Sequence, residues 1–153
     1  ALLRPGPPPI PEKTTLVLDL QGPVREQFAG GARDNLLRQA RGQPMRQTRL
    51  RDVLTALEAA ERDPAIVRVL LVTDDFAGAG PATLRELAAA LQRVRQAGKP
   101  VWAWGSSYTQ AAYYVAAHAD QVFMHPMGGV RIEGYGGHRT YYREAFERFG
   151  ISA

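Results

Sequence analysis

The sequence predicts a single α/β domain with a largely parallel β-sheet that is layered by helices. Two patterns predict this fold class. Apolar segments of strand length alternate with amphipathic segments of helix length, and the strands are rich in valine and leucine instead of alternating strictly with polar residues. The 153 residues suffice for one domain with a real core and are too few for two comfortable ones.

The composition is ordinary for a soluble globular protein and excludes some chemistry. Hydrophobic residues make up 45% and charged residues 22%, and no apolar run reaches the roughly 18 residues of a spanning helix. With no cysteine, the chain has no disulfide, no thiolate metal site and no cysteine nucleophile. The net charge of +4 comes almost wholly from arginine. No aromatic residue interleaves with the arginines between Arg33 and Arg51, so we expect a solvated segment and no nucleic-acid partner.

The first half of the chain begins with a proline-rich segment, residues 1–13, which we expect to be an extended linker. TTLVLDLQG then predicts a buried strand over 14–20, stopped by Gly22-Pro23. Residues 25–48 are polar and predict a loop with one short helix at 33–40. From Leu50 the apolar residues recur at helical spacing until Asp63-Pro64 ends the helix.

The second half continues the alternation of strands and helices. IVRVLLVTDD predicts a strand, FAGAG a flexible loop, and Pro81 the start of a helix that Gly98 closes. KPVWAWG predicts the next strand. The remaining predicted elements are a helix over 108–117, the strand QVFMH, a Pro/Gly-rich turn, the strand VRIEG and the helix YYREAFERFG.

Sites in parallel sheets lie where strands end, which selects Thr73–Gly80 and Trp104–Gln110. Gly78 and Gly80 precede a helix and offer backbone N–H groups that could bind an oxyanion or a peptide carbonyl. Asp74-Asp75 predicts a loop-capping role better than a metal site, because adjacent residues of an extended segment point apart. His118, His125 and His138 have no spacing that suits zinc, so no metal or cofactor is expected.

Ser106 and Ser107 invite the question of a serine nucleophile. Both stand where a helix begins, so they are predicted to be N-caps. His118, with Asp120 beside it, lies about ten residues farther along the helix, roughly 15 Å away. Lys99 lies at the opposite end of the intervening strand, also roughly 16 Å away. Neither base is within hydrogen-bond reach, and no local triad or Ser-Lys dyad is predicted.

The order and spacing of several segments resemble the signal peptide peptidase A family, the S49 serine peptidases. The segments are DPAIVRVLL, a Gly-containing loop and AGKPVWAWGSSYTQAAYYVAAHADQVFMHP, and the resemblance covers roughly residues 14–150. It implies the ClpP/crotonase-like fold. It also implies a long protein of two related halves, in which the C-terminal half carries the nucleophilic serine and the N-terminal half the general-base lysine.

By this resemblance the chain looks like the N-terminal half. With Gly105 and Tyr113 as anchors, Gln110 stands where the serine would be, and a carboxamide has no hydroxyl to attack a carbonyl. FAGAG stands in place of a substrate-binding S-P-G-G loop, from which Asp75, Phe76 and Ala77 depart. No catalytic residue is therefore expected here. The substrate-groove candidates are Gly78, Ala79, Gly80, Ser106 and Ser107.

The resemblance also implies a cellular setting. Residues 1–13 would be a linker after a removed membrane anchor, and residues 14–153 a domain that stops before the lysine segment. The parent would be a Ser-Lys endopeptidase of the bacterial inner membrane, with this domain on the periplasmic side. Its expected partners are the C-terminal catalytic half, further copies in a ring-like homo-oligomer, and cleaved signal peptides as substrate.

Two alternatives stay open at this point. A crotonase-like acyl-CoA enzyme would share the fold and could recruit Asp75 or Glu133 as its carboxylate. Alternatively, the domain could serve only for oligomerisation. In either peptidase or oligomerisation form, the 153-residue chain itself is expected to be inactive.

Overall fold

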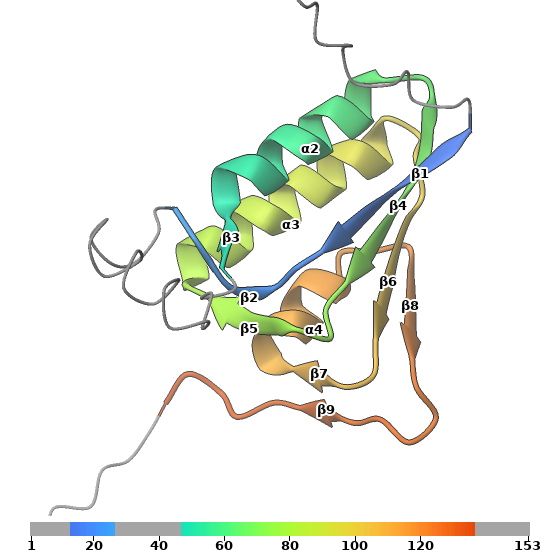
Figure 1. Cartoon of the computed structure of the whole chain (residues 1–153). Coiled ribbons are helices and arrows are strands. Elements are labelled where there is room, and N and C mark those ends of the chain that lie inside the picture. The colour runs from blue at the N-terminus through green and yellow to red at the C-terminus, as the bar shows by residue number, and fades with distance from the viewer. Residues whose placement is uncertain (1–12, 27–46, 137–153) are drawn as a thin grey trace, which may run out of the picture.

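The computed structural model describes residues 13–26 and 47–136, and it confirms the α/β fold class (Figure 1). Every strand pairing among these residues is parallel. The elements are β1 Thr14–Asp19, β2 Gly22–Arg25, β3 Thr48–Arg49, α2 Leu50–Arg62, β4 Ile66–Val72, β5 Phe76–Ala79, α3 Pro81–Gln96, β6 Val101–Gly105, β7 Tyr108–Thr109, α4 Gln110–Ala116, β8 Gln121–Met124 and β9 Val130–Arg131.

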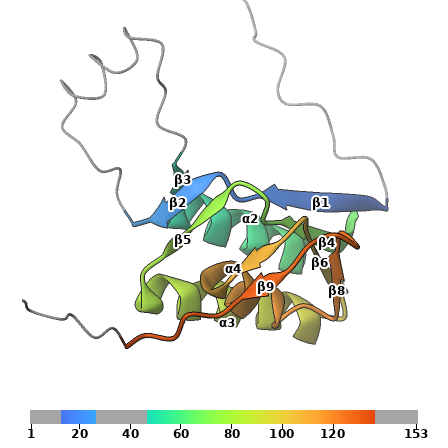
Figure 2. The same ribbon diagram turned by 90° about the horizontal axis from the view of Figure 1, so that it is seen from below.

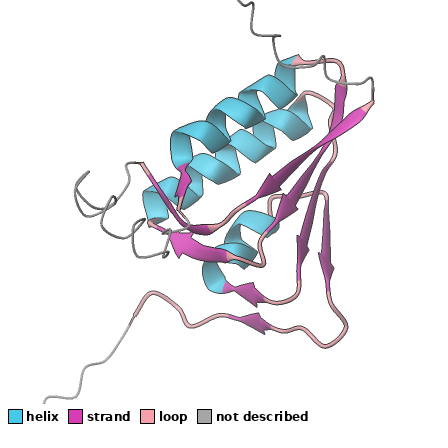
Figure 3. Cartoon of the chain, viewed as in Figure 1, coloured by secondary structure: helices cyan, strands magenta, loops and turns pink. Residues whose placement is uncertain are grey.

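The main sheet of the described residues has the strand order β1-β4-β6-β8. Its strands follow one another in the chain, and each crossover between them contains a helix on the same side of the sheet (Figures 1 and 3). Successive residues point to opposite faces. Val69 and Leu71 on β4 and Val101 and Ala103 on β6 therefore face the helices and are buried.

The predicted helices are confirmed by the residues that they bury. Helix α2 buries Leu50, Val53, Leu57 and Ala60, all at helical spacing. Helix α3 begins at Pro81, and Gly98 follows its end with a φ of 81°. Because this left-handed conformation costs glycine little, Gly98 can end the helix and turn the chain toward β6. The two helices pack side by side against the sheet (Figure 2).

The first strand ends before Gly22-Pro23, as predicted, but these two residues begin another strand, β2. The prediction that FAGAG is a flexible loop was wrong, because it contains β5. Together with β3 these form a second sheet, in the order β3-β2-β5. Pro23 is tolerated because β3 pairs only from Val24 onward and the pairing with β5 is irregular there.

The segments predicted as helix 108–117 and strand 130–134 are shorter than expected. Tyr108–Thr109 form β7, which pairs with Val130–Arg131 of β9, and α4 begins only at Gln110. Thr109 is extended, with ψ at 165°, and therefore belongs before the helix. Strand 14–20 ends one residue early, at Asp19, and the prediction that it is a buried strand was wrong, because only Leu18 and Leu20 of residues 14–20 are buried.

Some predictions lie outside the described residues: the linker apart from Lys13, the helix at 33–40, the helix YYREAFERFG, and His138. Among the helices that are described, none combines the length and the apolar character that crossing a membrane would require.

The turn between β8 and β9 depends on a glycine. A Cβ atom on Gly128 would lie 1.9 Å from the Ser106 carbonyl oxygen and 3.0 Å from that of His125. At the neighbouring Gly129 a Cβ atom would meet nothing within 4 Å. At Gly128 the backbone of the turn thus approaches the residue after β6 so closely that no side chain fits, whereas a side chain fits at Gly129.

We expect Gly128→Ala to lower the free energy of unfolding by about 1–3 kcal/mol, because the backbone must move apart to admit a methyl group. Gly129→Ala is the matched control and should change it by less than about 0.5 kcal/mol. Thermal unfolding checks this, with roughly 2–4 °C expected per kcal/mol. Equal losses in the two variants would contradict the proposed close approach.

Candidate functional site

The two segments singled out from the sequence meet at the carboxyl edge of the main sheet. Thr73 N–H donates to the Trp104 carbonyl at 3.1 Å, and the Ser106 N–H donates to the Asp74 carboxylate. A Cβ atom on Gly105 would lie 2.7 Å from the Thr73 hydroxyl oxygen, so this position requires glycine. Asp74 thus holds the loop after β6, the capping role that was predicted for the pair Asp74-Asp75.

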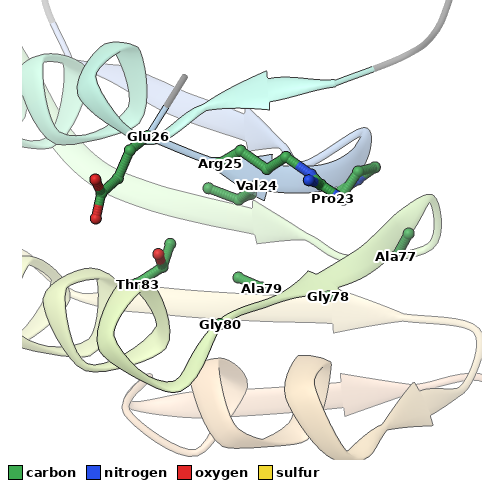
Figure 4. A pocket seen from close by; sticks show the side chains of 9 residues that line it. All are labelled: Pro23, Val24, Arg25, Glu26, Ala77, Gly78, Ala79, Gly80 and Thr83. Atoms are coloured by element: carbon green, nitrogen blue, oxygen red, sulfur yellow. The ribbon is translucent and has the colours of Figure 1, made fainter. Parts of the chain in front are cut away.

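Strand β5 places the predicted groove residues beside a cavity. Gly78, Ala79 and Gly80 line a cavity of about 510 Å³, opposite Val24 on β2. Figure 4 shows these residues on adjacent strands, with Glu26 and Thr83 at one end. Gly78 has a φ of 109°, a conformation that a side chain would strain.

A second cavity lies on the other side of β5. It measures about 420 Å³ and is lined by Ala77 and Ala79 of β5, by the start of α4, and by Arg131 and residues 133–135. In the order β3-β2-β5, β5 is the edge strand of the described sheet. An edge strand leaves backbone N–H and C=O groups available for pairing with another extended segment. This cavity is therefore the more suitable of the two for an extended peptide.

Gln110 stands between β5 and residues 131–135 as the first residue of α4. Its side-chain Oε1 accepts hydrogen bonds from the backbone N–H groups of Glu133, at 3.0 Å, and Gly134, at 2.6 Å. A carboxamide held in this way can position a backbone segment, but it offers no nucleophilic oxygen. Its place at the serine-equivalent position remains a prediction from the sequence.

Of the two serines, Ser107 has a structural partner for its hydroxyl, and Ser106 contributes its backbone N–H to Asp74. Ser107 Oγ accepts a hydrogen bond from the Gly129 N–H at 3.3 Å, which joins this loop to the turn before β9. The prediction that Ser106 or Ser107 caps the helix was wrong. Thr109 is the N-cap, and its hydroxyl accepts from the Ala112 N–H at 3.3 Å. Neither serine lines the two cavities that flank β5.

The bases considered for a dyad or triad are engaged elsewhere. Lys99 Nζ donates to the Ala60 and Asp63 carbonyls, at the end of α2. His118 Nδ1 lies 2.8 Å from the Tyr114 carbonyl oxygen. The carboxylate of Asp120 accepts from Arg95 Nε at 2.7 Å and from the Val101 N–H at 2.8 Å. These contacts satisfy backbone groups around the opposite, amino end of β6.

Tyr108 is the largest fully buried side chain near the site. Its hydroxyl donates to the Phe123 carbonyl at 2.7 Å. Burial, together with the negative charge of Asp74, raises the pKa of Tyr108 to about 12. The hydroxyl is therefore neutral and a donor at physiological pH, which suits a structural bond between β7 and β8.

Of the two residues considered as a carboxylate for other chemistry, Glu133 forms an ion pair and Asp75 contributes its backbone carbonyl. Glu133 Oε1 pairs with Arg131 at 2.7 Å on the surface, and the Asp75 carbonyl accepts from the Gly22 N–H at 2.8 Å. Over residues 13–26 and 47–136, no three histidine, aspartate or glutamate side chains gather as metal ligands.

The sequence is similar to known peptidases. The sequence profile of Peptidase family S49 matches residues 93–153, which include α4 and Gln110. Protease 4 of Salmonella typhi is 29% identical over 141 residues, 90% of this chain and 23% of that protein. Protease 4 of Haemophilus influenzae is 33% identical over 101 residues, 66% of this chain and 16% of that protein. The chain thus spans less than a quarter of the length of either relative.

The role of Asp120 in folding predicts a pH dependence. The hydrogen bond from Val101 and the Arg95 guanidinium together hold the pKa of Asp120 below its usual value, against a smaller effect of burial. A lowered folded-state pKa stabilises the protein above the unfolded-state pKa of about 3.9, and that stabilisation is lost as the pH falls.

We therefore expect Asp120→Asn to lower the free energy of unfolding by about 1 kcal/mol at pH 7. The loss is no larger because the carboxylate is partly exposed and its charge is screened by solvent. The variant should also lose part of the acid sensitivity below about pH 4. Denaturant unfolding at pH 3 to 7 measures both. Glu86→Gln, at an exposed position of α3, is the control. The same loss and the same pH profile in both variants would contradict the assigned role of Asp120.

Proposed function

This chain belongs to peptidase family S49, and we propose that it is a substrate-holding domain of a serine peptidase whose nucleophile lies elsewhere. The α/β fold is ClpP/crotonase-like, as the resemblance implied. Both relatives are proteases by name. The similarity to the Salmonella typhi protein covers 90% of this chain. This similarity favours the peptidase interpretation over an acyl-CoA enzyme.

The observation that carries the proposal is the state of Gln110. Its amide oxygen accepts hydrogen bonds from the backbone of residues 133 and 134, at the point where α4 begins beside β5. A nucleophilic serine needs a base within hydrogen-bond reach. Lys99 and His118 instead bond to carbonyls of α2 and α4. These contacts support the proposal that this domain holds substrate and that the nucleophile lies elsewhere.

The groove itself supports a binding role. An extended peptide adds to the edge of a sheet through main-chain hydrogen bonds, while side-chain pockets give selectivity. The edge strand β5 lies between two cavities, and Ala77 and Ala79 line both of them. Small side chains on this strand leave room for the backbone of a substrate. We assign Ala79 to the cavity at the open edge of β5, and Gly78 and Gly80, which line only the cavity on the β2 side, to the backbone of the strand with which a peptide would pair.

The finer assignment concerns the whole protein. We propose that the chain is the N-terminal, scaffold half of a membrane-anchored signal peptide peptidase, on the periplasmic side of the bacterial inner membrane. The C-terminal half would supply the serine, and a segment after Ala153 the lysine. The substrates would be cleaved signal peptides, and copies would assemble as a ring. The resemblance of the sequence and the length of the relatives support this proposal.

The purified 153-residue chain should show no peptide hydrolysis above the buffer blank. A fluorogenic apolar peptide is a suitable substrate, and the double change Ser106→Ala and Ser107→Ala should leave the result unaltered. Hydrolysis that disappears in the double variant would mean that one of these serines is a nucleophile, and the proposal would be wrong.

Substitution of Gly78 should weaken binding of an extended apolar peptide by at least about tenfold, roughly 1.4 kcal/mol. An added methyl group would strain the backbone at a φ of 109° and approach Ala111 Cβ to 3.6 Å. Gly98→Ala is the matched control, because Gly98 also has a positive φ but lies at the far end of α3. Fluorescence anisotropy with a labelled peptide measures both. Equal affinities in the two variants would exclude β5 as the docking strand.

A further inference from the structure

We propose that Gln110 occupies a binding site for the C-terminal carboxylate of an apolar peptide, and so acts as a built-in competitor for it. The site has two parts. The backbone N–H groups of Glu133 and Gly134 would hold the carboxylate, and a neighbouring apolar cavity would hold the last side chain of the peptide. The proposal rests on the proposed function, since a cleaved signal peptide ends in such a carboxylate.

The polar part of the site is already occupied by an oxygen atom, the side-chain Oε1 of Gln110. The N–H groups of Glu133 and Gly134 are consecutive in the chain, and both donate to the single atom Oε1 of Gln110. Gly134 has a φ of 79°, a left-handed conformation that costs glycine little. Successive N–H groups arranged in this way form a concavity that binds anions. A carboxylate accepts such bonds more strongly than a carboxamide does.

The apolar part lies directly beside it. A cavity of about 340 Å³ is lined by Gln110, Tyr113, Tyr114, Ala117, His118, Ile132, Gly134 and Tyr135. Its lining is almost wholly apolar, and His118 already bonds to the Tyr114 carbonyl through Nδ1. Ile132 is 65% and Tyr135 76% exposed, although both are large and apolar. Burying such surface stabilises a complex by roughly 25 cal/mol per Å².

The occupant follows from the combination of the two parts. The C-terminal residue of a peptide carries a carboxylate and a side chain on the same carbon, so it can reach both at once. Gln110, Gly134 and Tyr135 also line the cavity beside β5. A peptide whose last residue lies in the site therefore has a continuous path toward the edge strand. Gln110 stands on this path and must leave the two N–H groups before the carboxylate can bind.

Two substitutions of Gln110 test the proposal in the full chain. The probe is an N-acetylated hexapeptide of alanine and leucine with a free C-terminal carboxylate, and its C-terminal amide is the matched ligand. Gln110→Ala should bind the acid at least tenfold more tightly than the wild type does, and at least tenfold more tightly than the amide. Gln110→Glu should bind the acid more weakly than Gln110→Ala, because a carboxylate then fills the site from within.

The backbone N–H resonances of Glu133 and Gly134 give the location. In Gln110→Ala they should shift on addition of the acid and stay in place with the amide. If that variant does not fold, the wild type is titrated instead, and the side-chain NH₂ signals of Gln110 should move as the acid displaces it. Equal affinity for acid and amide, or shifts confined to other residues, would overturn the proposal.

Two further results separate this site from the groove along β5. Decanoate has a carboxylate and an apolar chain but no peptide backbone, and binding as tight as that of the peptide acid would overturn the assignment to a peptide. If the peptide binds only in the groove along β5, Gly78→Ala should weaken binding of the peptide acid and of the peptide amide by the same factor. A preference for the acid that persists in Gly78→Ala keeps the carboxylate site even if β5 plays no part.

Discussion

The close approach of Gly105 to Thr73 and Tyr108 is the constraint on which the site depends. No side chain fits at Gly105, because the Thr73 hydroxyl and the Tyr108 ring occupy the space. Tyr108 is thereby held at the end of β6, where its hydroxyl bonds to the Phe123 carbonyl of β8. The loop from 105 to 109, and with it the start of α4, takes its position from this contact. Gln110 reaches residues 133 and 134 only because α4 starts there.

Strand β5 turns a glycine-containing segment into part of a binding surface. Phe76 is buried and fixes the beginning of the strand in the core, while Gly78 and Ala79 remain at the edge. A buried anchor followed by small residues gives a rigid backbone with space on both sides of it. This arrangement explains why cavities lie on each side of one short strand. It also explains why the groove can hold a peptide without catalytic side chains of its own.

The side chains that resemble catalytic groups in the sequence serve the backbone instead. Lys99 satisfies carbonyls at the end of α2, and Asp120 satisfies the first N–H of β6. Ser107 accepts a bond from the turn before β9. Backbone polar groups away from water require partners, and helix ends leave several without one. In this domain these needs account for residues that would otherwise suggest a hydrolytic site.

The sequence by itself determined the parallel sheet, the helices α2 and α3 and the choice of Thr73–Gly80 and Trp104–Gln110 as site candidates, because periodicity and strand ends are local properties. It did not determine that FAGAG contains a strand, since the four residues Phe76–Ala79, with a glycine among them, form one only when β2 lies alongside. Nor did it predict that Thr109 caps α4, or that Gln110 accepts hydrogen bonds from the backbone of Glu133 and Gly134, more than 20 positions later. Those contacts join distant segments, and only the packing of the tertiary structure brings them within hydrogen-bond distance.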